Sequence, residues 1–167
     1  TVDDSIQEGT ETFDVNITAA TVDGNAATVV DSVGVVSITD NDTAVFTLTG
    51  DTSVTEGGTA NYTVTLTGAD LATGQTAVIN LATADGTAVN PADFADLAGA
   101  SYNAGTGELT LSGPLSINDT FAFTVSTVDD SIQEGTETFD VNITAATVDG
   151  NAATVVDSVG VVSITDN

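Results

Sequence analysis

The sequence predicts an all-β protein, an antiparallel β-sandwich of seven or eight strands that is repeated in tandem. Hydrophobic residues make up 41% of the 167 residues, and they alternate with threonine and other polar residues instead of recurring at a helical period. Glycine, asparagine and aspartate separate the alternating stretches, as they do at turns between strands. Because each strand then has one apolar face, two sheets are expected to pack on a common core.

A long identical repeat divides the chain into two unequal parts. Residues 1–41 and residues 127–167 have the same sequence, and the two copies begin 126 residues apart. Repetition at a fixed period indicates a tandem array. We therefore interpret residues 42–167 as one complete 126-residue repeat, and residues 1–41 as the C-terminal third of a preceding identical repeat.

Alternation also locates the individual strands of the complete repeat. In the clearest stretch, residues 60–67, Tyr62, Val64 and Leu66 face one way and the threonines face the other. A loop is expected at residues 85–96, which carry Gly86 and Pro91. The expected strands are residues 44–49, 60–67, 76–83, 100–103, 108–112, 120–128, 136–144 and 154–165.

Residues 1–41 contain only the last two strands of a repeat. Two strands alone are marginally stable in water, so we expect this segment to need the front part of its own repeat. A longer chain could supply that part, or another molecule could supply it by strand complementation. The positions expected to face inwards are Phe13, Val15, Ile17, Val36 and Ile38.

The composition is strongly acidic and excludes several classes of function. There are 25 Asp and Glu residues and no Lys, Arg or His, which gives a formal charge of −25. Nothing can neutralise phosphate, so duplex nucleic acid is excluded as a partner. With no Cys, disulfides and zinc–thiolate sites are excluded as well. No apolar run approaches the roughly 18 residues of a membrane span, so no membrane insertion of this segment is expected.

The same composition indicates an extracellular environment and a need for cations. A chain without Cys and without a flexible linker is typical of a large exported bacterial surface protein, so an extracellular or cell-surface location is expected. Like charges in a compact state repel one another. Metal cations or high salt are the expected remedy.

Carboxylates gather in four loops, at residues 54–58, 85–94, 129–137 and 40–42. Successive connections alternate between the two ends of a sandwich, so these loops can share the end to which the next repeat attaches. Carboxylates brought together raise one another's pKa, and a hard cation removes that penalty. Calcium suits such a site because it takes about 6–8 oxygen ligands in flexible geometry, whereas magnesium prefers to keep its waters. We therefore predict Ca²⁺ at the junction between repeats.

The motifs EGG, DGTA followed by PADF, VDDSIQEGTETF and VSITDND occur in the order found in the Calx-beta domain. The sequence resembles that family, known from sodium–calcium exchangers, integrin β4 and large bacterial surface proteins, over residues 42–167 and again over 1–41. The resemblance implies an Ig-like β-sandwich with calcium at its distal loops. The ligands that it implies in the complete repeat are Glu56, Asp93, Asp129, Asp130, Glu134 and Asp166, with Asn167 nearby. Those that it implies in the preceding repeat are Asp3, Asp4, Glu8, Asp40 and Asp42, with Asn41 nearby.

The sequence departs from the family pattern at four positions. Asn41 and Asn167 stand where the family often has Asp, Ser131 replaces a frequent third acid, and Phe94 stands where Tyr is usual. These departures are compatible with one or two ions and imply weaker binding.

Identical tandem copies also resemble the extender repeats of giant secreted bacterial adhesins, including those with RTX-type export signals. We therefore expect a calcium-rigidified spacer whose partners are the neighbouring identical repeats, while other domains contact a host, substratum or glycan target. One alternative is the protomer of an extracellular filament. Another is a glycan-binding surface module, in which Tyr62 and Tyr102 would stack on a sugar. An enzyme is not expected, because the chain has no His, no Trp and no cleft-forming insertion.

Overall fold

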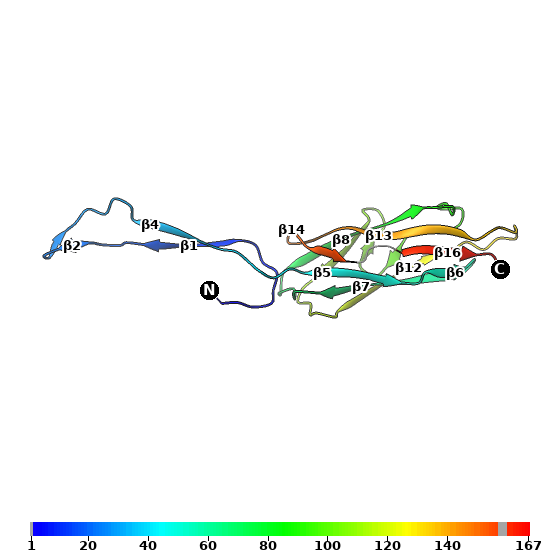
Figure 1. Cartoon of the computed structure of the whole chain (residues 1–167), viewed down its shortest axis with the longest axis horizontal. Helices are drawn as coiled ribbons and strands as arrows, with labels where there is room; N and C mark the ends of the chain where they lie inside the picture. Colours follow the sequence, from blue (N-terminus) through cyan, green and yellow to red (C-terminus); the bar gives the residue numbers. More distant parts are fainter. Residues whose placement is uncertain (1, 157–159) are drawn as a thin grey trace.

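The computed structural model describes residues 2–156 and 160–167, and its regular elements there are all β-strands. Figure 1 shows an elongated molecule, with a β-sandwich on one side and a narrow hairpin projecting from one of its ends. The C-terminus lies at the opposite end of the sandwich. In the part of the chain that the structure describes, no helix is long and apolar enough to cross a membrane.

Two sheets form the sandwich. In spatial order the first sheet contains β10 (Tyr102–Asn103), β11 (Glu108–Ser112), β8 (Thr76–Asp85), β13 (Glu137–Val148), β16 (Gly160–Thr165) and β6 (Ser53–Thr55), with β14 (Asn151–Ala152) beside β13. The second sheet contains β15 (Thr154–Val156), β5 (Val45–Gly50), β7 (Thr59–Thr67), β12 (Thr120–Ser126) and β9 (Ala98–Gly99). The predicted fold class, an Ig-like β-sandwich, is confirmed.

The core consists of the inward faces of both sheets. Along β7 the side chains of Tyr62, Val64 and Leu66 are buried, as their alternation predicts. The rings of Phe94 and Phe139 stack with their centroids 4.4 Å apart. Because Phe94 lies in the long loop after β8, this contact attaches that loop to the sheet. The loop predicted at residues 85–96 is therefore anchored at its far end.

The stretch 154–165, predicted to be one strand, is divided between the two sheets. β15 pairs with β5 in one sheet, and β16 pairs with β13 in the other; residues 157–159 between them lie outside the described residues. The two halves have different partners: β15 forms an edge of its sheet, next to β5, whereas β16 lies between β13 and β6 in the other sheet. The strand predicted at 136–144 also extends further, to Val148, past a bulge between Ile143 and Ala145.

The start of the repeat changes sheets in the same way. β5 is followed closely by β6, which was predicted to be loop and which pairs in parallel with β16. The end of β5 passes close to Tyr62 of β7: a Cβ added at Gly50 would lie 2.3 Å from the Cδ1 atom of that ring. Only glycine fits there. The pairs β5–β15 and β6–β16 are parallel, so the predicted antiparallel arrangement holds for the other named pairs but not for these two.

The projecting hairpin is the same sequence as the last hairpin of the complete repeat and has the same register. β1 (Glu11–Asn16) pairs with β4 (Val33–Ile38), and Phe13 lies opposite Val36 as Phe139 lies opposite Val162. A short pair, β2 (Thr21–Val22) and β3 (Asn25–Ala26), forms its tip. Phe13 is 47% exposed, whereas Phe139 is fully buried. In the described residues no second sheet covers the hairpin, so the positions predicted to face inwards in residues 1–41 are left partly or largely open.

These two phenylalanines give a matched test of the core. We expect Phe139→Ala to lower the free energy of unfolding of the complete repeat by about 3–5 kcal/mol, because it removes a fully buried ring and its partner in the stack. Phe13→Ala makes the same change in the same local sequence, but at an exposed position. It should change the free energy of unfolding by no more than about 0.5 kcal/mol. Urea unfolding followed by circular dichroism measures both. Equal effects of the two substitutions would contradict this assignment of the core.

Candidate metal centre

Loops from both sheets meet at the C-terminal end of the sandwich. Three backbone hydrogen bonds join them: Glu56 N–H donates to the Thr165 carbonyl (2.9 Å), Gly57 N–H to the Val128 carbonyl (3.2 Å), and Val128 N–H to the Asp93 carbonyl (2.9 Å). The carboxylates that line the pocket between these loops are Glu56, Asp93, Asp130, Glu134, Glu137 and Asp166. The predicted convergence of acidic loops at one end therefore holds for five of the implied ligands.

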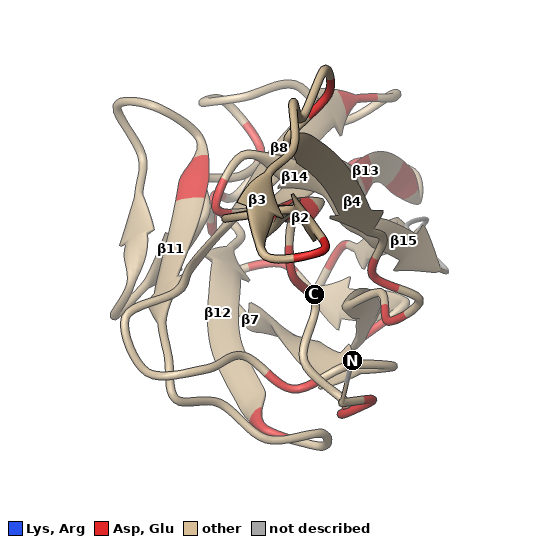
Figure 2. Cartoon of the chain, turned by 90° about the vertical axis from the view of Figure 1, so that its left-hand side faces the viewer, with Lys and Arg blue, Asp and Glu red and all other residues tan. Residues whose placement is uncertain are grey.

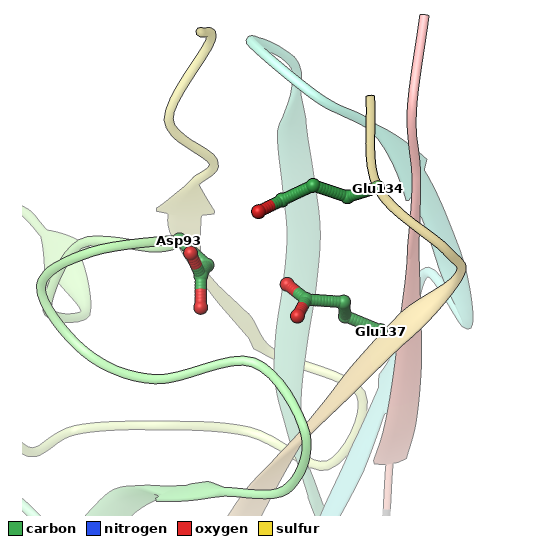
Figure 3. A group of neighbouring side chains, drawn as sticks. All are labelled: Asp93, Glu134 and Glu137. Carbon is green, nitrogen blue, oxygen red and sulfur yellow. The ribbon is translucent and has the colours of Figure 1, made fainter. Parts of the chain in front are cut away.

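Three of these carboxylates come closest together. Asp93, Glu134 and Glu137 each place an oxygen so that the three atoms lie within 4.8 Å of one another. Figure 3 shows the three side chains pointing toward a common space, from the loop after β8, the loop before β13 and the first residue of β13. Two oxygens on opposite sides of a calcium ion lie about 5 Å apart, twice the Ca–O distance. The spacing and the all-oxygen donors of this cluster therefore fit Ca²⁺.

Glu137 was not among the ligands that the resemblance implies. Its position in β13 contains the signal that could have identified it, because Glu137, Phe139 and Val141 alternate along one face of the strand. Phe139 and Val141 are fully buried, so Glu137 is a carboxylate on the core-facing side at the end of the sandwich. Removing a carboxylate from water at that position costs free energy unless a hydrogen-bond donor or a cation compensates its charge.

Asp129 and Asn167 lie outside the pocket and contact each other. The Asn167 side-chain N–H donates to the Asp129 carboxylate at 3.0 Å. Gly57 lies against the other side of Asp129: its φ is +71°, and a Cβ added there would lie 2.9 Å from the Asp129 Cβ. The backbone at Gly57 thus requires glycine twice over, by its left-handed conformation and by the space available.

The pocket carboxylates are also oriented by backbone donors. Glu56 accepts a hydrogen bond from Asp130 N–H at 3.0 Å, and Asp166 accepts one from Glu134 N–H at 3.2 Å. Each bond fixes one oxygen of its carboxylate. The loops therefore present oriented oxygen donors around a small volume, which is the arrangement that a hard cation binds.

No cation of the protein offsets these charges, because the sequence has no Lys, Arg or His; no basic residue is coloured in Figure 2. Loss of hydration raises the pKa of Glu134 above its ordinary value, and the charges of Glu137 and Asp130 raise it further. Loss of hydration, followed by the charge of Asp93, also raises the pKa of Glu137. Assembling the cluster therefore costs free energy when its members are ionised.

A second cluster of carboxylates lies at the junction between the hairpin and the sandwich. Asp40 accepts hydrogen bonds from Glu8 N–H (2.7 Å) and Asp42 N–H (3.1 Å). Loss of hydration raises the pKa values of Glu8 and Asp42, and neighbouring carboxylates add to both shifts. The acidic and amide side chains that line this pocket are Asp3, Asp4, Glu8, Glu11, Asp40, Asn41 and Asp42. All of the ligands that the resemblance implies for the preceding repeat are brought together here, and Glu11, the copy of Glu137, joins them.

The second cluster also borders the sandwich that follows it. A further pocket is lined by Glu8, Asp40 and Asp42 on one side and by Asn151 and Ala152 of the complete repeat on the other. The carboxylates at this end are therefore placed at a contact between two repeats, whereas those of the first cluster lie at the end of the sandwich away from the hairpin.

An Ig-like sandwich with carboxylates gathered on the loops of one end defines a small class of β-domains. In a comparison with models of protein families, the Calx-beta domain matches residues 1–42 and 39–167, which together span the chain. The chain therefore belongs to the Calx-beta domain family. A search of curated proteins gives no significant match. Calx-beta domains typically bind calcium and are non-catalytic.

The pKa shifts predict how stability depends on pH. A carboxyl group whose pKa is raised by folding stabilises the fold fully below its ordinary pKa, which is 4.5 for Glu134 and Glu137, and loses that contribution as the pH rises through its folded pKa. In a chelating buffer we therefore expect the melting temperature of the chain to fall between pH 4.5 and pH 7. Differential scanning calorimetry measures this.

Calcium is the control for that experiment. With saturating Ca²⁺ the sign should reverse, because protons then compete with the ion for the same carboxylates. In chelator, replacing Glu134 and Glu137 together by Gln should flatten the slope. A melting temperature that is constant or rises with pH in chelator would contradict the assignment of these shifts.

Proposed function

We propose that this repeat is a calcium-stabilised structural spacer of a giant bacterial cell-surface adhesin, and that Ca²⁺ at the junctions holds adjacent repeats rigidly in line. The observation that supports it most is the junction cluster, in which the carboxylates of one repeat border the sandwich of the next. An ion bound there stabilises the folded state and also restricts the angle between repeats. The location is extracellular, and other domains of the adhesin contact its target.

The identical repeat supports a role in extending the length of a rod-like array. Two copies of one 41-residue sequence produce the same hairpin register, and each places four corresponding carboxylates around an acidic pocket, which supports equivalent junctions along an array. Equivalent junctions add up to a regular rod. A switch or sensor has no use for such uniformity.

A filament assembled by strand complementation is the second candidate, and the open apolar side of the hairpin favours it, with Phe13, Val15 and Ile17 about half exposed. Against it, the complete repeat already contains its own copy of that hairpin, β13 with β16. A second molecule would have to displace an identical segment, which offers no gain in contacts. The mass of the native polypeptide separates the two: about 16.6 kDa supports the filament, and a much longer chain supports the spacer.

The glycan-binding alternative has less support. Tyr62 is 2% exposed and stacks on Phe123 inside the sandwich, so its ring is not available to a sugar. Tyr102 is only partly buried, but one aromatic ring makes a weak platform.

Removing calcium tests the spacer directly. At a calcium concentration 100 times its Kd, one site stabilises the fold by about 2.7 kcal/mol, and chelation should lower the melting temperature of the chain by about 10 °C. Small-angle scattering should show a loss of maximum dimension at the same time, because the junction loses its ion. If chelation changed neither the melting temperature nor the scattering profile, the proposal would be wrong.

A single substitution tests the site itself. We expect Glu137→Gln to weaken calcium binding at the C-terminal cluster by about tenfold or more, because it removes one of three converging carboxylates. Glu108→Gln is the matched control: Glu108 is also the first residue of a strand and is also half-buried, but it lies outside the cluster. Isothermal titration calorimetry compares the two variants. A larger effect of Glu108→Gln than of Glu137→Gln would contradict the assignment.

A further inference from the structure

Gln7 is a buried polar residue at the contact between the hairpin and the sandwich, only 4% exposed. Its Oε1 accepts a hydrogen bond from Ala44 N–H at 2.7 Å, and its Nε2 donates to the Ala152 carbonyl at 3.1 Å. Both polar atoms of the amide therefore have partners on the complete repeat. Buried polar groups are tolerated when they are satisfied in this way.

The backbone around Gln7 is bound to the same surface. The Ser5 carbonyl accepts a hydrogen bond from Asp70 N–H at 2.8 Å, and Ile6 forms a parallel bridge with Asp70. The carbonyl of Gln7 accepts one from the Gln75 side chain at 2.7 Å. Residues 5–7, the docking segment, are thus held by both main-chain and side-chain contacts.

The receiving residues are fixed by their own repeat. Gln75 Oε1 accepts a hydrogen bond from Ala72 N–H at 2.7 Å, which orients its Nε2 toward the docking segment. The Asp70 carboxylate accepts one from Ile117 N–H at 2.8 Å. We define the front surface of the repeat as Ala44, Asp70, Gln75 and Ala152. Because it is preorganised, little ordering is needed when a segment docks on it.

Residues 131–133 are the second copy of the docking segment, and they are exposed. Ile132 is 63% exposed, whereas its copy Ile6 is half-buried against the front surface. Among the described residues, no surface contacts residues 131–133 in the way that the front surface contacts residues 5–7. It therefore presents an amide and an apolar side chain to solvent at the far end of the molecule.

Both copies of the segment are shaped by the same local hydrogen bonds. The Asp4 carboxylate accepts from Ile6 N–H at 3.0 Å, and the Asp130 carboxylate accepts from Ile132 N–H at 2.6 Å. The bond to Asp166 that orients Glu134 likewise has its counterpart between Asp40 and Glu8. The exposed copy therefore already has the local frame that positions Gln7.

We propose that residues 131–133 form a docking plug for the front surface of a further copy of the repeat, with Gln133 taking the place there that Gln7 takes on this one. The inference rests on the proposed tandem array, because a further repeat must follow. It adds a lock between repeats that is independent of the metal. The lock sets the rotation of one sandwich about the next through four hydrogen bonds, one to each residue of the front surface.

An amide suits this place for two reasons. It both donates and accepts, so it matches an N–H and a carbonyl at once, and a partner that lacks either group leaves a buried polar atom unpaired. It is also uncharged, so it brings two strongly acidic ends together without adding to their repulsion. The lock therefore selects another copy of this repeat over an unrelated β-domain.

The test uses the full chain lengthened at its C-terminus by a second copy of residues 42–167. The sequence has no Cys, so Thr110→Cys and the same change in the added copy introduce a pair of spin labels on exposed positions of two successive sandwiches. Electron–electron double resonance measures the distance distribution between them with saturating Ca²⁺ and in chelator. Hydrogen exchange of the Ala44 amide and of its added copy reports on each docking contact.

With Ca²⁺ bound, we expect Gln133→Ala to widen the distance distribution and to speed exchange at the added copy of Ala44 by about tenfold, because that amide loses its acceptor. Gln7→Ala is the matched control: it should speed exchange at Ala44 itself and leave the labelled junction unchanged. Gln133→Glu keeps an oxygen that can accept from the amide of the added Ala44, but it places a second oxygen against the carbonyl of the added Ala152. Exchange at the added Ala44 should therefore be faster in Gln133→Glu than in the unchanged chain.

The two calcium conditions separate this inference from the proposed function. If Gln133→Ala changed neither distribution nor exchange while chelation widened the distribution, calcium alone would fix the junction and the docking plug would be overturned. If Gln133→Ala widened it while chelation had no effect, the plug would stand and the calcium spacer would fail. If both changes widened it, both proposals would be supported.

Discussion

Repulsion between carboxylates is the constraint on which the rest of this structure depends. The folded chain gathers acidic loops at each end of a sandwich, and the sequence has no basic side chain to offset them. Backbone donors such as the N–H groups of Asp130 and Glu134 orient several of the oxygens, but they do not neutralise them. The core formed by the two sheets must therefore hold together a set of loops that electrostatics drives apart, and a divalent ion bound between those loops would change this balance.

The sequence was sufficient to predict the class of fold, because alternation along strands such as β7 depends only on local pattern. It was insufficient where pairing depends on strands far away in the sequence, and so residues 154–165 were expected as one strand although they belong to two sheets. The acidic loops could be predicted to converge, because loops at one end of a sandwich are neighbours. Glu137 was missed because it belongs to a strand, and Gln7 because its partners Ala44 and Ala152 lie 37 and 145 residues away.

The identical segments show how far local sequence determines structure. Both copies form the same hairpin register and the same turns in front of it, so these features are local. Burial is not: Phe13 is 47% exposed and Phe139 is fully buried, although their sequence neighbours are the same. The elements packed against a segment therefore decide how much it contributes to stability. In a tandem array every copy has the same neighbours, except the copies at the two ends.

The parallel pairs β5–β15 and β6–β16 have a mechanical consequence. They place the first strands of the repeat beside the last ones, running in the same direction. Tension along an array pulls the entering strands toward one end and the leaving strands toward the other. The hydrogen bonds between them are then loaded in shear, all together and along the strand axis, instead of being opened one at a time from an end. A pull along the array axis would therefore have to break several of these hydrogen bonds together.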